Sequence, residues 1–315
     1  MAEWTVEPAE AGRRLDRFLA VTGRLGSRGR AFDALARGKV FLNGREAVPE
    51  ARGARLVAGD IVRVWMDRPG TSKRRATLGD RRDLPIVYED DAVVVLNKPA
   101  GVLPVPLERR EGARSVFEDL DTYLRARSGQ RPLVVHRIDR DTSGLVVFAK
   151  TAAAQSDLKA QFKSRQPERV YLAVVYGHPA PASGTWRDRL AWDRKALIQK
   201  ETHATDARGK EAVCHYRVIE TLRGASLIEV RLVTGRRNQI RLQAGLRGHM
   251  LVGERRYNHG PGSLRPIAFP RQALHAHQLR FLHPRDRREL AFEAPLPADL
   301  ADLLDRLRRD RPRCG

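Results

Sequence analysis

Apolar residues form short continuous runs from residue 84 onward, and segments with helical spacing lie between the runs. Such runs are typical of buried strands, which we expect at 93–97, 133–138, 145–149, 170–175 and 227–232. Helical spacing predicts helices at 115–127, 151–163, 238–246 and 298–309, with Thr151 as an N-cap and the last helix amphipathic. The elements do not alternate strictly. This order predicts an α+β fold with a mixed or antiparallel sheet, not a doubly wound one.

Residues 10–66 form a separate pattern of two helices followed by a hairpin. The first helix carries apolar residues at 15, 18 and 19, and the second begins at Ser27 and ends at Gly38. A strand at 40–42 is followed by Asn43 and Gly44, the strongest short hairpin signal, and another strand is expected at 61–65. We therefore expect a small independent unit at the N-terminus.

Residues 66–82 lack apolar periodicity and contain Pro69-Gly70 followed by a basic run at 73–75. This composition is typical of a linker. With 315 residues, the chain is long enough for two domains. We expect an N-terminal domain at 1–68, a basic linker at 69–83 and a larger domain at 84–315.

The net charge of the chain indicates what kind of partner it binds. Lys and Arg total 59 against 38 acidic residues, a net charge of +21. Such an excess favours a polyanionic partner, first of all nucleic acid. The sequence has no long apolar segment and no signal-peptide pattern, so we expect a cytoplasmic protein that does not enter a membrane. The two cysteines, Cys214 and Cys314, are too few for a disulfide scaffold or a zinc knuckle.

The densest polar segment lies between two of the predicted strands and reads His136-Arg137-Ile138-Asp139-Arg140-Asp141-Thr142-Ser143-Gly144. Cations at 137 and 140 favour the ionised form of Asp139. An ionised, oriented carboxylate can serve as a nucleophile or an electrostatic stabiliser. Two other interpretations stay open from the pattern alone: a solvated turn with an ion pair, and a metal site on His136, Asp139 and Asp141.

This segment resembles the signature of the RluA-type pseudouridine synthases, with Ile138 in place of the commoner Leu. Three further blocks resemble the family in the same order: 88–101 with its Lys98-Pro99-Ala100-Gly101 turn, 168–173, and 234–241. The resemblance covers roughly residues 84 to 300, and it implies the mixed-sheet catalytic domain of these enzymes. Four ordered blocks are more specific than any single one.

The resemblance implies roles for particular residues. Asp139 matches the essential carboxylate, Tyr171 the active-site tyrosine that stacks on the base or relays a proton, and Arg241 the arginine that pairs with the aspartate. Arg137 matches the residue that fills the gap left by an extruded base. We expect His136 to pack or hydrogen-bond within its motif, and Lys98 and Arg236 to position groups or bind phosphate.

The N-terminal unit resembles the S-four-type RNA-binding domain, through the block at 14–19 and the block at 38–44. This resemblance implies one phosphate-facing surface that would carry Arg24, Arg28, Arg30, Arg37 and Lys39. A solvated charged face is the alternative for each of them.

The sequence therefore predicts a monomeric RNA pseudouridine synthase that needs no cofactor and no metal. Large-subunit ribosomal RNA is the favoured substrate and transfer RNA the alternative. A non-catalytic ribosome-assembly factor and a metal nuclease are the other hypotheses. Asn238 and Gln243 stand where the family usually has His, and Val105-Pro106 replaces Val-His-Pro. These departures leave the choice of substrate open but not the class of reaction, since Asp139, Tyr171 and Arg241 all match the family.

Overall fold

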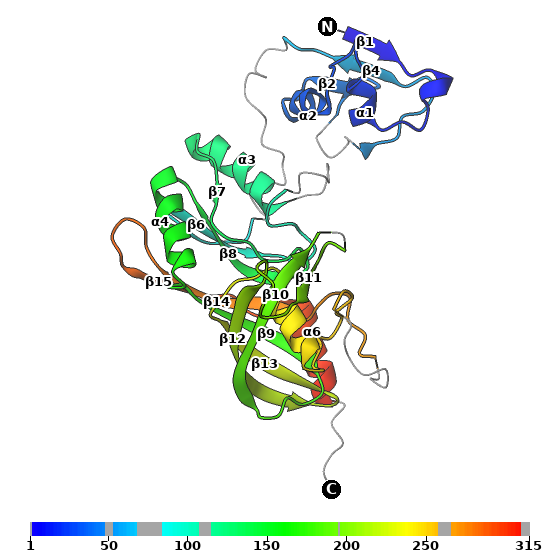
Figure 1. Ribbon diagram of the computed structural model, residues 1–315. Helices are drawn as coiled ribbons and strands as arrows, with labels where there is room; N and C mark the ends of the chain where they lie inside the picture. Colours follow the sequence, from blue (N-terminus) through cyan, green and yellow to red (C-terminus); the bar gives the residue numbers. More distant parts are fainter. Residues whose placement is uncertain are drawn as a thin grey trace. The chain divides into compact units, whose positions relative to one another are not determined.

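The computed structural model describes residues 2–47, 53–67, 84–106, 115–194, 196–257 and 266–309. They belong to two compact units, Met1–Asp83 and Leu84–Gly315 (Figure 1). The predicted basic linker at 69–83 lies outside the described residues. None of the described helices is long and apolar enough to cross a membrane.

Unit 1 contains a four-stranded antiparallel sheet in the order β1-β4-β2-β3. Its elements are β1 (Ala2–Thr5), a 3-10 turn (Pro8–Glu10), α1 (Leu15–Leu19), α2 (Arg28–Ala36), β2 (Val40–Leu42), β3 (Arg45–Glu46) and β4 (Ile61–Val64). Both helices pack apolar side chains against the sheet, and the core includes Leu15, Phe18, Leu35, Val40 and Val62.

Local signals in unit 1 act as the sequence predicts. The Ser27 hydroxyl accepts a hydrogen bond from the Arg30 backbone N–H at 3.2 Å and begins α2. Asn43 and Gly44 both have positive φ, 50° and 78°, which is the geometry of a tight hairpin turn. The short strand β1, which pairs with β4, was not predicted.

Unit 2 is built on an 11-stranded sheet in the order β11-β10-β12-β13-β9-β14-β8-β6-β5, with β15 paired to β14 and β7 to β8. The strands are β5 (Ile86–Glu89), β6 (Val93–Lys98), β7 (Leu133–Val134), β8 (Ser143–Ala149), β9 (Glu168–Tyr176), β10 (Ser183–Asp193), β11 (Ile198–Glu201), β12 (Lys210–Leu222), β13 (Ala225–Leu232), β14 (Leu274–Leu282) and β15 (Glu289–Glu293). The pairing is antiparallel except between β14 and β8. The predicted α+β class with a mixed sheet is confirmed.

Among the described residues, four helices cover this sheet: α3 (Val116–Ser128), α4 (Ala152–Lys163), α5 (Gln239–Leu246) and α6 (Ala298–Arg309). Alternation along β9 separates two cores. Tyr171 and Ala173 pack with Ile240 and Ala244 of α5, while Leu172 packs on the other face with the leucines of α6. The two faces of β9 are therefore buried by different helices, and Tyr171 lies on the α5 side.

The parallel strands β14 and β8 lie unusually close together in the middle of the sheet of unit 2. Ala276 of β14 is in register with Gly144 on one side and with Tyr171 on the other. A Cβ atom on Gly144 would lie 2.2 Å from the Ala276 carbonyl oxygen, so only glycine permits this close approach. Gly144 has φ +112° as well, which other residues rarely adopt. The start of β8, and the loop that precedes it, are thus held one strand away from Tyr171.

Two predicted elements have different bounds in the structure. The strand expected at 133–138 ends at Val134. Beyond it, the Val147 backbone N–H of β8 donates to the His136 side chain instead of to a backbone carbonyl of this segment. The helix expected from 238 begins at Gln239, because Asn238 is left-handed at φ 53°. The long strands β10 and β12 were not predicted.

Candidate active site

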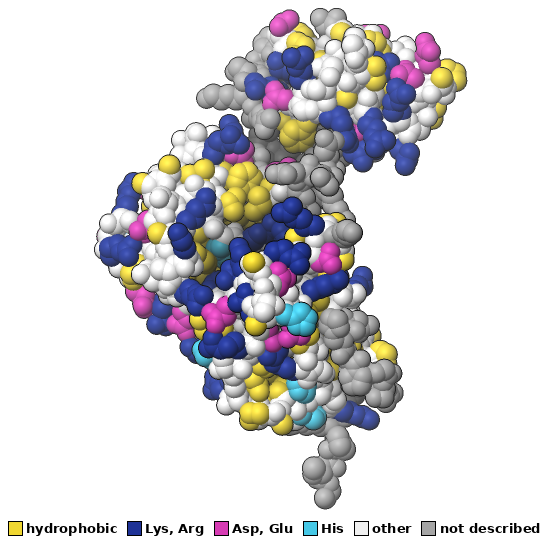
Figure 2. Space-filling model, in the orientation of Figure 1, with side chains coloured by type: hydrophobic (Ala, Val, Ile, Leu, Met, Phe, Trp, Pro, Cys, Tyr) yellow, Lys and Arg dark blue, Asp and Glu magenta, His cyan; other side chains and the backbone are white. Residues whose placement is uncertain are grey.

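A pocket of about 600 Å³ opens in unit 2 where the 135–142 loop, β9 and the start of α5 meet. Its lining brings together Asp139, Tyr171 and Arg241, which are far apart in the sequence. Lys and Arg side chains are frequent on the face shown in Figure 2. Among the described residues that line the pocket, Asp139 is the one carboxylate, and the basic ones are Arg137, Lys163, Arg165, Arg169, Arg236, Arg237 and Arg241.

Asp139 lies on a loop that is anchored in the hydrophobic core through its neighbour. Its neighbour Ile138 is 5% exposed and packs in the same core as Tyr171 and Ile240. The Asp139 carbonyl accepts from the Thr142 backbone N–H at 3.2 Å, which closes a turn. The Asp139 side chain is 26% exposed, so its carboxylate can meet a molecule that enters the pocket.

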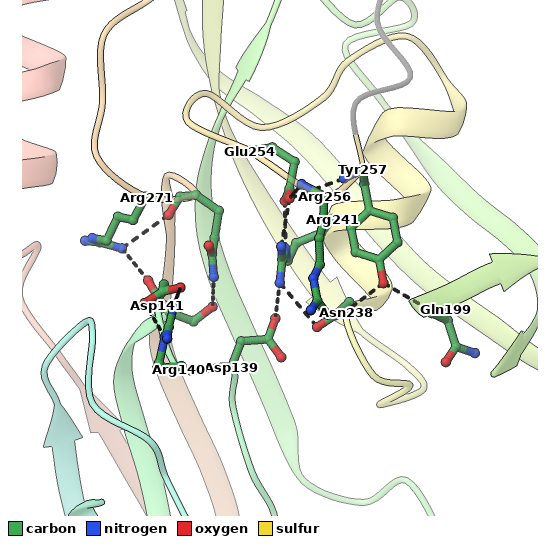
Figure 3. A network of polar contacts seen from close by, with 12 residues as sticks. Asp139, Arg140, Asp141, Gln199, Asn238, Arg241, Glu254, Arg256, Tyr257 and Arg271 are labelled. Carbon is green, nitrogen blue, oxygen red and sulfur yellow. Dashed lines mark hydrogen bonds and ion pairs between the residues drawn. The ribbon is translucent and has the colours of Figure 1, made fainter. Parts of the chain in front are cut away.

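Arg241 joins Asp139 to a second, fully buried carboxylate (Figure 3). Its Nη1 lies 3.2 Å from Asp139 Oδ2, while its Nε and Nη2 each donate to Glu254 at 2.7 Å. The Glu254 side chain has no exposed surface. A bidentate pair fixes the plane of a guanidinium, so Glu254 aims the free edge of Arg241 at Asp139.

The backbone turn at 253–257 holds the Glu254 carboxylate in place. Glu254 Oε1 accepts from the backbone N–H groups of Arg255 and Arg256 at 2.9 and 2.7 Å. Burial raises the pKa of Glu254, but Arg241 and the backbone N–H groups of Arg256 and Tyr257 outweigh it and hold the pKa below the ordinary value. Gly253 has φ +75°, and a Cβ there would lie 1.9 Å from the Arg271 carbonyl oxygen, so this turn requires glycine.

The two departures from the family on α5 have different surroundings. Asn238 lies 2.9 Å from both carboxylate oxygens of Asp139. Gln243 donates to Asp188 at 2.6 Å and to the Ala212 carbonyl, and it is not part of the pocket lining. The two departures therefore differ in place: Asn238 contacts the central carboxylate, and Gln243 belongs to the packing beneath α5.

Tyr171 lines the pocket from a buried position on β9. Within the described parts of the chain, no group hydrogen-bonds this hydroxyl. Burial, together with the nearby Asp139 charge and against the opposing effect of Arg169, raises the pKa of Tyr171 to about 12. The phenol is therefore neutral at physiological pH, and its ring and hydroxyl are both available to a bound base.

Lys98 anchors the Asp139 loop from beneath. Its side chain is completely buried at the end of β6, and Nζ donates to the carbonyl oxygens of Pro99, Val102 and Arg140 at 2.7–2.8 Å. Burial lowers the pKa of Lys98 to about 7, while the charges of Asp141 and Asp139 act in the opposite direction. Lys98 thus positions the loop and has no surface with which to contact RNA, which corrects the RNA-binding role expected for it.

Other residues of the same loop differ in their roles. Arg140 pairs with Asp141 through two contacts of 3.0 Å, not with Asp139 as its position suggested. His136 accepts from the Val147 backbone N–H at 3.1 Å and stacks on Phe162. Burial, and to a lesser extent Arg169, lower the pKa of His136 to about 3, so it is a neutral part of the wall. Arg137 is exposed at the pocket.

Arg236 contributes to the same pocket from the turn before α5. Its Nε donates to the Glu211 carbonyl at 2.9 Å, and its backbone N–H donates to Gln239. The Gln239 side chain also accepts from the Thr234 hydroxyl at 2.7 Å. These bonds hold the turn so that its basic side chains line the pocket.

A metal site on His136, Asp139 and Asp141 would require these three side chains to lie around one point. Among the described residues, no group of three His, Cys, Asp or Glu side chains is arranged to hold a metal ion. The pairing of Asp141 with Arg140 and the hydrogen bond of His136 to the Val147 backbone separate these two residues from Asp139.

The basic residues of unit 1 are engaged with neighbours to different degrees. Arg28 pairs with the nearly buried Asp16 at 3.1 Å, and Arg37 pairs with Asp33 at 2.7 Å. Lys39 donates to the Met66 carbonyl, and Arg24 pairs with Glu10 at 2.9 Å. Arg30 is exposed. Most of these residues therefore also hold unit 1 together, and the single phosphate-facing surface stays a prediction.

Sequence reasoning missed the residues that orient the site. Glu254 and Tyr257 were not singled out, because they lie in a polar turn outside the four motif blocks. The one available signal was a lone acidic residue directly after Gly253 and before two arginines. Their contacts to Arg241 and Asn238 depend on the fold and appear only once α5 is packed.

The comparisons with known proteins agree with this geometry. Residues 92–245 match the family model described as RNA pseudouridylate synthase. The chain is 37% identical over 299 residues to ribosomal large subunit pseudouridine synthase D of Zymomonas mobilis, with 92% of each chain covered. It is 34% identical to the uncharacterized RNA pseudouridine synthase YlyB of Bacillus subtilis, covering 97% of this chain and 98% of that protein. The solved structure of human RNA pseudouridylate synthase domain containing 1 covers 76% of this chain and 99% of its own, with a TM-score of 0.56 and 25% identity.

Proposed function

Since this chain belongs to the family of RNA pseudouridine synthases, we propose that it isomerises uridines of large-subunit ribosomal RNA, with Asp139 as the essential carboxylate. The observation that carries the proposal is the Asp139–Arg241 pair at 3.2 Å inside a basic pocket. The relatives named for the large ribosomal subunit support the choice of RNA.

The reaction needs no external oxidant or energy source. The N1–C1′ bond of uridine breaks, uracil C5 bonds to C1′, the proton leaves C5 and N1 gains a proton. The uridine must first leave its stack to reach a pocket, at a cost of about a few kcal/mol that is lowest in a loop. The basic lining favours the phosphates on either side of the extruded nucleotide.

In our proposal four pocket residues have different tasks. Asp139 meets the reacting sugar or base, and Arg241 keeps its carboxylate aimed. Tyr171 stacks on uracil, and its neutral hydroxyl is a weak base, so any proton that it accepts must be passed on in the same step. Arg137, exposed at the pocket, fills the gap left by the extruded base.

We also propose that unit 1 binds RNA through its basic side chains and that the protein works as a cytoplasmic monomer. The exposed Arg30 supports this role, because its guanidinium lies where a phosphate can reach it. The hypothesis of a non-catalytic assembly factor is disfavoured, because it gives no reason for an oriented carboxylate in a pocket.

Release of tritium tests the proposal directly. RNA labelled with tritium at uridine C5 loses the label to water when C5 bonds to the sugar. We expect the purified protein to release tritium from a large-subunit ribosomal RNA transcript and to leave pseudouridine at defined positions. Release from transfer RNA but not from ribosomal RNA would overturn the substrate, and no release from either would overturn the activity.

A further inference from the structure

The orientation of the Asn238 amide follows from a chain of hydrogen bonds that starts in β11. The Gln199 backbone N–H donates to the Tyr257 hydroxyl oxygen at 3.1 Å. A tyrosine hydroxyl carries one hydrogen, which points to the Asn238 side chain 2.9 Å away. The Asn238 carbonyl oxygen therefore faces Tyr257, and its NH2 group faces Asp139. Figure 3 shows Asn238 between these two residues, with its amide drawn in the opposite orientation.

The contact of the Asn238 NH2 group with Asp139 supports the same orientation of the amide. Carboxylate oxygens can only accept, and the Asn238 nitrogen lies 2.9 Å from both oxygens of Asp139. One amide hydrogen, shared between the two carboxylate oxygens, makes both contacts. Tyr257 itself is 1% exposed, so its hydroxyl has a fixed place.

The backbone leaves the Asn238 side chain free for this task. Asn238 stands at the N-cap of α5, where a side chain usually caps the helix, yet it makes no capping hydrogen bond. Its φ of 53° and ψ of 25° lie in the left-handed region, where Asn, Asp and His are enriched. A residue that tolerates this backbone and carries an N–H donor is therefore needed here.

We propose that Asn238 is a positioning residue for the reaction, which holds the Asp139 carboxylate in its working orientation through a relay from Tyr257. This inference rests on the proposed function. Arg241 reaches only one Asp139 oxygen, so on its own it leaves the carboxylate able to rotate about the Cβ–Cγ bond. Asn238 contacts both oxygens and removes that freedom.

One turn serves both positioning residues. Glu254 grips Arg241, and Tyr257, three residues later, orients Asn238. The Arg241 guanidinium also lies over the Tyr257 ring at 5.3 Å. Tyr257→Phe would keep this ring and remove only the hydroxyl, which makes it a specific probe of the relay.

Kinetics of Asn238→Ala, Asn238→His and Tyr257→Phe test the proposal. We expect Asn238→Ala to lower kcat about 10- to 100-fold, because it loses hydrogen bonds to a charged group, with KM within a few-fold. Asn238→His, with a ring N–H donor, should regain most of the activity, and Tyr257→Phe should lose less than Asn238→Ala. Asn43→Ala is the matched control: Asn43 is also left-handed and donates to Asp60 at 2.8 Å, but it lies in unit 1, so its kcat should not change.

An unchanged kcat in Asn238→Ala, an effect confined to KM, or failure of the His variant would overturn the inference. A second readout is independent of activity. In protein labelled with 15N-asparagine, the side-chain amide signal of Asn238 is the one that Asn238→Ala removes. We expect this signal to shift in Asp139→Ala and in Tyr257→Phe. A signal that does not move would overturn the relay, whereas a moving signal in a protein that releases no tritium would overturn only the proposed function.

Discussion

Arg241 Nη1 lies 3.2 Å from Asp139 Oδ2, and the rest of the Arg241 guanidinium is held by the buried Glu254. One cation therefore serves two carboxylates, one hidden and one open to the pocket. The positive charge of Arg241 stabilises the buried Glu254 carboxylate, and the orientation of its guanidinium positions the Asp139 carboxylate. Substitutions can therefore affect stability and catalysis separately.

Arg241→Lys should separate the two tasks. A lysine keeps the charge but cannot hold both Glu254 oxygens and reach Asp139 at the same time. Because Glu254 is buried, we expect the ammonium to stay with it, so that kcat falls about 10- to 100-fold while stability falls by about 1–3 kcal/mol. Single-turnover tritium release and urea unfolding measure the two effects. A kcat equal to wild type would show that Arg241 does not aim Asp139.

Glu254→Gln should change how stability depends on pH. The pKa of Glu254 is held below its ordinary value of 4.5 in the folded chain. The stability that this provides is present above pH 4.5 and is lost as the pH falls through the folded value. Urea unfolding between pH 3 and 7 should therefore show a difference between wild type and Glu254→Gln that is largest at pH 7 and shrinks toward pH 3. A difference that is constant with pH would contradict the pairing.

Tyr171 should stay protonated at high pH. Burial raises its pKa to about 12, so its hydroxyl is neutral throughout the range from pH 7 to 10. The tyrosinate absorbance of wild type and Tyr171→Phe should therefore coincide up to pH 10 and diverge only above it. Turnover should show no loss near pH 10 that depends on Tyr171. Divergence of the two absorbance titrations centred at pH 10 would mean that the site is more solvated than its burial indicates.

Removal of residues 1–83 should weaken RNA binding without abolishing chemistry. Unit 2 contains Asp139, Tyr171, Arg241 and Asn238, and it is a compact unit of its own. We expect the truncated protein to convert a short target. The salt dependence of its binding should become shallower by about 0.7–0.9 for each RNA phosphate that unit 1 neutralises in the full chain. An unchanged salt slope would show that unit 1 does not bind phosphates.

Much of the fold follows from local signals. The buried strands β6, β8 and β9 are continuous apolar runs, and α3 and α4 begin at the hydroxyl caps Ser115 and Thr151. The strands β10 and β12 were missed because one of their faces is charged. Arg187 in β10 pairs with Glu211 in β12, and such cross-strand pairs lack the apolar runs by which a strand is recognised.

The residues of the site also fall into those that the sequence predicts and those that depend on the fold. Asp139, Tyr171 and Arg241 come from motif blocks, and the fold brings them to one pocket. The contacts of Asn238 and Glu254 could not be predicted, because they depend on how the 253–257 turn packs against α5. The burial of Lys98 is also a tertiary effect: from the sequence it is a lysine before a proline, and in the fold it binds three carbonyl oxygens.

Single-turnover tritium release by Asp139→Asn tests the central claim most directly. This substitution keeps the size of the side chain and one oxygen acceptor but removes the charge. With enzyme in excess over a labelled ribosomal RNA transcript, we expect no release above background and RNA affinity within a few-fold of wild type. Measurable conversion by the purified Asp139→Asn protein would contradict the assignment of Asp139 as the essential carboxylate.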